Sequence, residues 1–144
     1  MRAKRSGGFT LVEILIVVVI LGILSAIVVP QFTGATEEAQ KAATVDQLVK
    51  IREAIDLYHV KNNAQYPQIV AGVGDPAWGQ LIGPGYMRGA AINSWVGGAN
   101  SKTVVIGTGP DSTYQNTHGW IFNPATGELW AGSYDSNDDP FPKP

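Results

Sequence analysis

The sequence predicts an α+β fold, with one long N-terminal helix packed against a small antiparallel β-sheet. Three observations lead to this prediction. An apolar run with a single charge covers residues 9–30, an amphipathic helical pattern covers residues 31–65, and glycine-rich and proline-rich stretches with short strand patterns cover residues 66–144. A short basic segment, residues 1–8, comes first. We therefore expect a helix shared by two segments and a loop-rich β domain at its distal part.

The apolar run is long enough to cross a membrane. Between Phe9 and Val29 the only charged residue is Glu13, and about 20 apolar residues suffice to span a bilayer as a helix. Three basic residues lie among the first five positions. Because basic flanks stay on the cytoplasmic side, we expect a single-pass helix with a cytoplasmic N-terminus, and everything after residue 30 outside.

Two simpler interpretations of the run are a secretory signal peptide, cleaved near residue 26, and a plain signal anchor. The small-x-small pattern before signal-peptide cleavage is poor, because Leu24 stands two residues before Ala26. Glu13 argues against both interpretations, since a carboxylate inside the run costs roughly 2.5 kcal/mol or more on insertion. A targeting signal gains nothing from that cost. We therefore expect Glu13 to have a function of its own.

Residues 7–13, GGFTLVE, follow basic residues and open the apolar helix. This segment resembles the leader and first helical turn of type IV prepilins and type II secretion pseudopilins, and the resemblance is close from Gly8 to about Pro30. It implies that a prepilin peptidase, which is also a methyltransferase, cuts after Gly8 and methylates the new N-terminus at Phe9. It also implies an inner-membrane precursor with a periplasmic C-terminal domain. Copies of the chain would then polymerise into a helical filament, with an inner-membrane assembly platform and minor pseudopilins as partners.

The chemistry of the cut chain agrees with that resemblance. Cleavage after Gly8 creates an α-ammonium on Phe9, which is mostly protonated at neutral pH, and methylation retains its positive charge. Glu13 stands four residues further along the same helix. In a dry bundle of such helices, Glu13 of one chain can neutralise the Phe9 ammonium of its neighbour. We therefore predict an assembly ion pair between Phe9 and Glu13 that sets the register of neighbouring chains.

Gly22 and Pro30 are the two positions of weak helix propensity in this region. One interpretation is that Gly22 permits close helix packing and that Pro30 marks the exit from the bilayer. The resemblance adds another, because filaments of the family loosen the helix between the corresponding positions, which makes them extensible. Both interpretations stay open on the sequence.

The amphipathic helix is expected to end near residue 63, where two asparagines and then a Tyr-Pro pair interrupt the pattern. Beyond it, residues 119–123 and 128–132 predict a β-hairpin, because the Pro-Ala-Thr-Gly sequence between them supplies turn-forming proline and glycine. This stretch also resembles the terminal hairpin of many pilin-like subunits. Residues 103–106 predict a third strand. The glycine pairs at 72–74 and 107–109 precede Asp-Pro or proline, so no helix and no anion site is expected after them.

The four tryptophans suit either a ligand platform, for example for a sugar, or the core of a small domain that is poor in aliphatic residues. We favour the core. They are Trp78, Trp95, Trp120 and Trp130. The two histidines, His59 and His118, have no metal-ligand neighbours at helix or strand spacing, so we expect both at the surface or at its rim.

Asp135, Asn137 and Asp139 alternate with the D-x-N-x-D spacing that opens many calcium loops. Pro140 then stands where such loops place glycine. A solvated acidic tail is the simpler interpretation, and we favour it. The resemblance supports calcium, because major pseudopilins of type II secretion carry the ion near the C-terminus, but their glycine-rich acidic ending is missing here. Calcium is the one cofactor that the sequence suggests.

The amino-acid composition argues against several classes of function. The chain has no cysteine, so no disulfide stabilises it. From residue 66 onward it has three basic and six acidic residues, which gives no electrostatic footprint for nucleic acid. No catalytic motif is present, so we expect no enzyme. The prediction is a structural subunit of a pilus-like filament, most similar to a major pseudopilin of type II secretion. The alternatives are a type IV pilin for adhesion or motility and a membrane-anchored periplasmic ligand-binding domain.

Overall fold

The computed structural model describes residues 8–144, and for residues 28–33 it describes the backbone only. Residues 1–7, which make up most of the predicted leader, lie outside the described residues, and so does the side chain of Pro30. Contacts divide the chain into two compact units, Met1–Glu37 and Glu38–Pro144.

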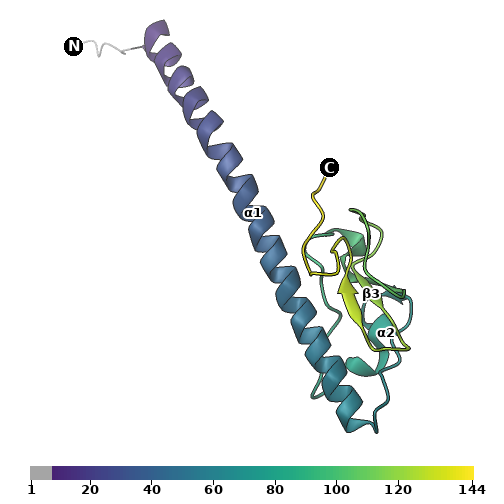
Figure 1. Ribbon diagram of the computed structural model, residues 1–144. Coiled ribbons are helices and arrows are strands. Elements are labelled where there is room, and N and C mark those ends of the chain that lie inside the picture. Colours follow the sequence, from purple (N-terminus) through teal and green to yellow (C-terminus); the bar gives the residue numbers. More distant parts are fainter. Residues whose placement is uncertain (1–7) are drawn as a thin grey trace, which may run out of the picture. The chain divides into compact units, whose positions relative to one another are not determined.

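Helix α1 (Leu11–Lys61) is 51 residues long (Figure 1). The helix continues through positions 22 and 30, so neither Gly22 nor Pro30 ends it. Its C-terminus lies where the sequence predicts it. Asn63 and Ala64 adopt left-handed backbone angles, with φ of 55° and 60°, and the Ala64 amide donates to the His59 carbonyl at 3.0 Å. Left-handed residues of this kind close helix ends by satisfying their last carbonyls.

The second unit carries a four-stranded sheet in the order β1-β2-β3-β4. The strands are β1 (Gly72–Val73), β2 (Thr103–Ile106), β3 (Trp120–Phe122) and β4 (Leu129–Ala131). Strands β3 and β4 pair antiparallel, with Ile121 opposite Trp130. In the turn between them, the Gly127 amide donates to the Asn123 carbonyl at 2.8 Å, and Gly127 has a φ of 74°. The predicted hairpin and the predicted strand at 103–106 are confirmed.

The prediction of an entirely antiparallel sheet is wrong for one strand pair. Strands β2 and β3 run parallel, with Val105 opposite Ile121. A parallel pair needs a connection of about a dozen residues or more to bring the chain back to the same end, and residues 107–119 supply it. The edge strand β1 has two residues, which is too short to leave a strand pattern in the sequence.

A second expectation also fails. The glycine pair at 72–74 is followed by a short helix, α2 (Asp75–Trp78), which has a proline in its first turn. Proline is tolerated there because the first amides of a helix have no partner within it. The Asp75 carboxylate accepts a hydrogen bond from the Ala90 amide at 2.7 Å, so this helix start carries a negative charge of its own. Two 3₁₀ helices, η1 (Gly79–Leu81) and η2 (Ala99–Lys102), complete the unit.

The hydrophobic core of the second unit lies between α1 and the sheet. Leu48, Ile51 and Ile55 of α1 are buried together with side chains of α2, β3 and β4. Trp78 and Trp120 meet edge to face, with ring centroids 6.1 Å apart. Three of the four tryptophans are buried, namely Trp78, Trp95 and Trp120, and Trp130 is half-buried. Burial of most of the indole surface confirms the core interpretation.

One polar side chain crosses this core. Asn93 is fully buried, and its amide nitrogen donates to the carbonyls of Gly119 at 2.8 Å and Gly132 at 3.0 Å. Its amide oxygen accepts from the Val96 backbone amide at 3.0 Å. Asn93 therefore joins the segments that lead into β3 and out of β4 to the chain that precedes β2. Buried polar groups persist only when they are satisfied in this way.

Candidate functional site

Among the side chains that the structure describes, the apolar part of α1 packs against nothing in its own unit. Every described side chain between residues 8 and 27 is exposed, and Phe9 and Leu11 are exposed by 84% and 83%. A helix that is apolar all round requires burial in a membrane or against other helices. By length and hydropathy, no helix within the described residues qualifies as a membrane span.

The first turn of α1 is closed by a reciprocal pair of hydrogen bonds between Thr10 and Glu13. The Glu13 carboxylate accepts from the Thr10 backbone amide at 2.7 Å and from the Thr10 hydroxyl at 2.8 Å. The Glu13 amide in turn donates to the Thr10 hydroxyl oxygen at 3.2 Å. This is a capping box. The T-x-x-E spacing typical of this motif is present in the sequence at Thr10 and Glu13, so Glu13 has a helix-capping role in addition to the predicted pairing with Phe9.

The predicted cleavage junction lies just outside this capped turn. Gly8 and Phe9 precede the helix and are exposed, and a side chain at position 8 would meet nothing within 4 Å. In the uncut chain Phe9 has a backbone amide and no ammonium, so the predicted ion pair with Glu13 can form only after cleavage. Because Gly8 and Phe9 are exposed, the junction is accessible. Within the single chain, Thr10 is the hydrogen-bond partner of the Glu13 carboxylate.

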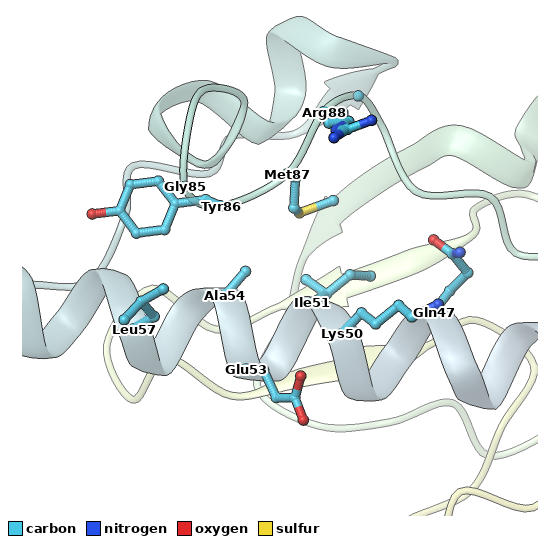
Figure 2. A pocket seen from close by; sticks show the side chains of 11 residues that line it. Gln47, Lys50, Ile51, Glu53, Ala54, Leu57, Gly85, Tyr86, Met87 and Arg88 are labelled. Carbon is cyan, nitrogen blue, oxygen red and sulfur yellow. The ribbon is translucent and has the colours of Figure 1, made fainter.

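A groove opens between α1 and the loop at residues 83–89 in the second unit (Figure 2). Its volume is about 550 Å³. Ile51 and Ala54 point from α1 toward the loop, whereas Glu53 points away from it (Figure 2). The loop is held by bonds of Met87, whose amide donates to the Leu81 carbonyl at 2.9 Å. The lining is mixed, with apolar side chains on the floor and the charged groups of Lys50, Glu53 and Arg88 around them. It offers a contact surface and no nucleophile paired with a base.

The residues of the predicted calcium loop lie together in one turn, where one carboxylate oxygen each of Asp135 and Asp139 has a protein partner. One Asp135 carboxylate oxygen accepts from the backbone amides of Asn137 at 2.8 Å and Asp139 at 3.0 Å. These two hydrogen bonds hold the pKa of Asp135 below its ordinary value. The Asp139 carboxylate pairs with Lys41 at 3.1 Å. Within residues 8–144, as far as side chains are described, no three acidic or histidine side chains come together as a metal site.

The two histidines differ in their surroundings. His59 is half-buried and stacks on Tyr66, with ring centroids 4.4 Å apart, which agrees with the expected rim position. The His118 side chain is only 14% exposed, and its Nε2 lies 3.4 Å from the Asp111 carboxylate. His118 is therefore placed more deeply than a surface residue.

Tyr134 provides a test of core burial through pH. Burial, together with the charges of Asp138 and Asp139, raises the pKa of the Tyr134 hydroxyl to about 12. Tyr134 of the unfolded chain ionises first, at its ordinary pKa near 10. The stability that the fold gains from keeping this hydroxyl neutral is therefore complete below about pH 10 and is lost as pH rises toward 12. We expect the melting temperature to fall more steeply between these pH values in the wild type than in Tyr134→Phe. Tyr114→Phe, which removes a hydroxyl from a half-buried ring, should leave the steep fall in place.

Comparison with known proteins defines the class first. Residues 3–29 match the family model described as the prokaryotic N-terminal methylation motif. This match covers the junction, the capped turn and most of the apolar part of α1. A helix that begins with this motif and continues into a small α+β unit is the arrangement of a pilin-like protein.

Relatives then define the family. The chain is 32% identical over 123 residues to the type II secretion system core protein G of Dickeya chrysanthemi, an alignment that covers 75% of this chain and 80% of the relative. It is 34% identical over 103 residues to the protein of the same name from Pseudomonas aeruginosa, covering 66% and 72%. The relative from Aeromonas hydrophila is 41% identical over 73 residues, 51% of this chain and 50% of the relative; the chain thus spans about half the length of that relative. No solved structure matches. The chain belongs to the family of the type II secretion system core protein G.

Proposed function

We propose that this chain is the major pseudopilin of a type II protein secretion system, a structural subunit rather than an enzyme. One observation carries the proposal: every side chain described between residues 8 and 27 is exposed, and this apolar segment has an accessible Gly8-Phe9 junction at its start and Glu13 as its single charge. Such a surface is satisfied by lipid before assembly and by identical helices afterwards. The relatives named as core protein G support the assignment to secretion.

The proposed life of the subunit follows from that surface. The precursor lies in the inner membrane as a single-pass protein, with its N-terminus in the cytoplasm and its second unit in the periplasm. A prepilin peptidase cuts after Gly8 and methylates Phe9. Copies of the chain then leave the membrane and form a periplasmic helical filament, with the inner-membrane assembly platform and minor pseudopilins as further partners. The match to the N-terminal methylation motif supports the processing step.

Flexibility of α1 belongs to the same proposal. In the subunit the helix continues through positions 22 and 30, and a side chain at Gly22 would meet nothing within 4 Å. Glycine and proline both weaken a helix once its surroundings change. We propose that the segment between Gly22 and Pro30 loosens in the filament and allows it to extend.

The alternative of a ligand-binding domain rested on the tryptophans. Three of them are buried in the core, so they do not form an open platform for a sugar. The alternative of a type IV pilin for adhesion or motility shares the N-terminal motif. The names of the relatives favour the secretion filament over the pilus.

Processing is the first test. Mass analysis of the protein from its host is expected to show a mature chain that begins at Phe9 and carries one added methyl group, and sheared filaments should contain it. Gly8→Val should leave the precursor uncut, because the peptidase is expected to cut after glycine at this position. The new side chain would meet nothing in the fold, so the substitution acts only at the junction. Gly22→Ala, at another open glycine, should be cut normally. A mature chain that begins near residue 27 would show an ordinary signal peptide instead.

A further inference from the structure

We propose that Arg52 serves as a built-in cation for the C-terminal loop, so that residues 133–144 close onto α1 without a bound metal ion. We call the group formed by Arg52 and Lys41 of α1 with Asp138 and Asp139 of the loop the C-terminal clasp. The proposal concerns the second unit alone and holds whether or not the chain forms filaments. It disagrees with the calcium site that the family resemblance suggested.

Arg52 is the centre of the clasp. Its two terminal nitrogens donate to the two carboxylate oxygens of Asp138, at 2.6 Å and 3.0 Å. Nε and one terminal nitrogen also donate to the Leu129 carbonyl, at 3.0 Å and 2.8 Å. The side chains of Arg52 and Asp138 are 37% and 30% exposed, so the pair is partly withdrawn from water. A fork of this geometry is specific to arginine, and here it joins α1, β4 and the loop.

The loop is shaped to present Asp138 to that fork. The Asp135 carboxylate holds the amides of Asn137 and Asp139, and the Asp138 amide donates to the Asp135 carbonyl at 3.2 Å. Asp138 itself has a left-handed φ of 61°. Aspartate and asparagine are among the few residues other than glycine that adopt this conformation at low cost. The Asp135 carboxylate therefore makes its hydrogen bonds within the turn, and the turn directs Asp138 toward α1.

A second set of contacts continues the closure beyond the loop. Lys41 pairs with Asp139, and the Lys143 ammonium lies 4.3 Å from the centre of the Trp95 ring. Trp95 donates its indole hydrogen to the Phe141 carbonyl at 3.1 Å. Phe141 in turn donates its amide to Ser133 at 2.9 Å. The closed segment includes Tyr134, which is fully buried.

The donor set explains why a calcium ion does not fit this loop. Calcium takes six to eight oxygen ligands that converge on one point. Both Asp138 oxygens accept from the guanidinium, whereas one oxygen of Asp135 accepts from two backbone amides and one oxygen of Asp139 pairs with Lys41. Asn137 takes part through its backbone amide. An entering ion would have to displace both cations and break the turn that aligns the loop.

Hydrogen exchange of the full chain in detergent tests the clasp directly. The amides of Asp139 and Phe141 report closure of the loop, and the amides of Gly107 and Gly119, which bond within the sheet, report global unfolding. In Arg52→Met, which retains the apolar stem, we expect loop amides to exchange about tenfold faster relative to sheet amides, a change of about 1.4 kcal/mol. Lys50→Met also removes a cation from α1, but one that pairs only with Asp46, and should leave the ratio unchanged.

Two further arms complete the test. Asp138→Asn keeps a residue suited to the left-handed angle and should reproduce the faster loop exchange, even if Arg52→Met does not fold. In the wild type, calcium and chelator should give the same melting temperature, whereas calcium at 100 times its dissociation constant would add about 2.7 kcal/mol if it bound. Loop exchange at the wild-type ratio in Asp138→Asn would overturn the proposal. So would a calcium-dependent rise in the melting temperature of the wild type.

Discussion

Glu13→Ala is expected to abolish filament assembly while membrane insertion and cleavage after Gly8 continue. The substitution removes a charge that opposes insertion, and it leaves Gly8 and Phe9 unchanged. During assembly, however, the Phe9 ammonium would enter the dry helix bundle without its carboxylate. Breaking a buried ion pair in this way costs on the order of 3–5 kcal/mol, and the cost recurs at every subunit. The measurement compares the amount of sheared filament with the amount of mature subunit retained in the membrane, in the variant and in the wild type.

Glu13→Gln separates the helix cap that the structure shows from the ion pair that the sequence predicts. Glutamine can replace glutamate in a capping box, so this variant retains the bonds with Thr10 and loses only the charge. The ion-pair hypothesis predicts that Glu13→Gln and Glu13→Ala both fail to assemble. Normal filament yield from Glu13→Gln with failure of Glu13→Ala would assign the effect to the helix cap. Normal yield from both would remove the argument for an ion pair altogether.

Asn93→Ala is expected to be the most damaging single truncation of a polar side chain in the second unit. It leaves the Gly132 carbonyl and the Val96 amide without the partners that Asn93 provides. Each unsatisfied buried group costs roughly 1–3 kcal/mol, which gives about 2–6 kcal/mol for the two groups. For a unit of about this size, that loss lowers the melting temperature by about 10 °C or more.

Thermal unfolding of the full chain in detergent, followed by circular dichroism, measures this effect. Asn100→Ala is the matched control, because its exposed amide makes a single hydrogen bond, to the Asn116 carbonyl at 2.7 Å, and surface substitutions usually change stability by less than about 0.5 kcal/mol. If Asn93→Ala melts with the control, the Asn93 bonds are not what joins β3 and β4 to the preceding chain.

Features that depend on residues close together in the sequence could be predicted without the fold. The apolar run, the junction at Gly8 and Phe9 and the anomaly of Glu13 depend on residues that follow one another in the chain. The end of α1 and the β3–β4 hairpin depend on turn residues within a few positions. Helical periodicity and turn chemistry are local properties, so the sequence by itself determined the helix, the hairpin and the candidate processing site.

Only the tertiary structure decided the pairings between distant segments. The parallel register of β2 and β3 depends on the path of the intervening residues. Asn93 reaches carbonyls 26 and 39 residues away, and Arg52 reaches a carboxylate 86 residues away. The sequence suggested a calcium loop at a place where, in the fold, Lys41 pairs with Asp139 and Arg52 pairs with the neighbouring Asp138. The physical reason is that D-x-N-x-D spacing shows only which oxygens are close in the sequence. The side chains that meet the loop depend on which distant residues of the packed helix lie beside it.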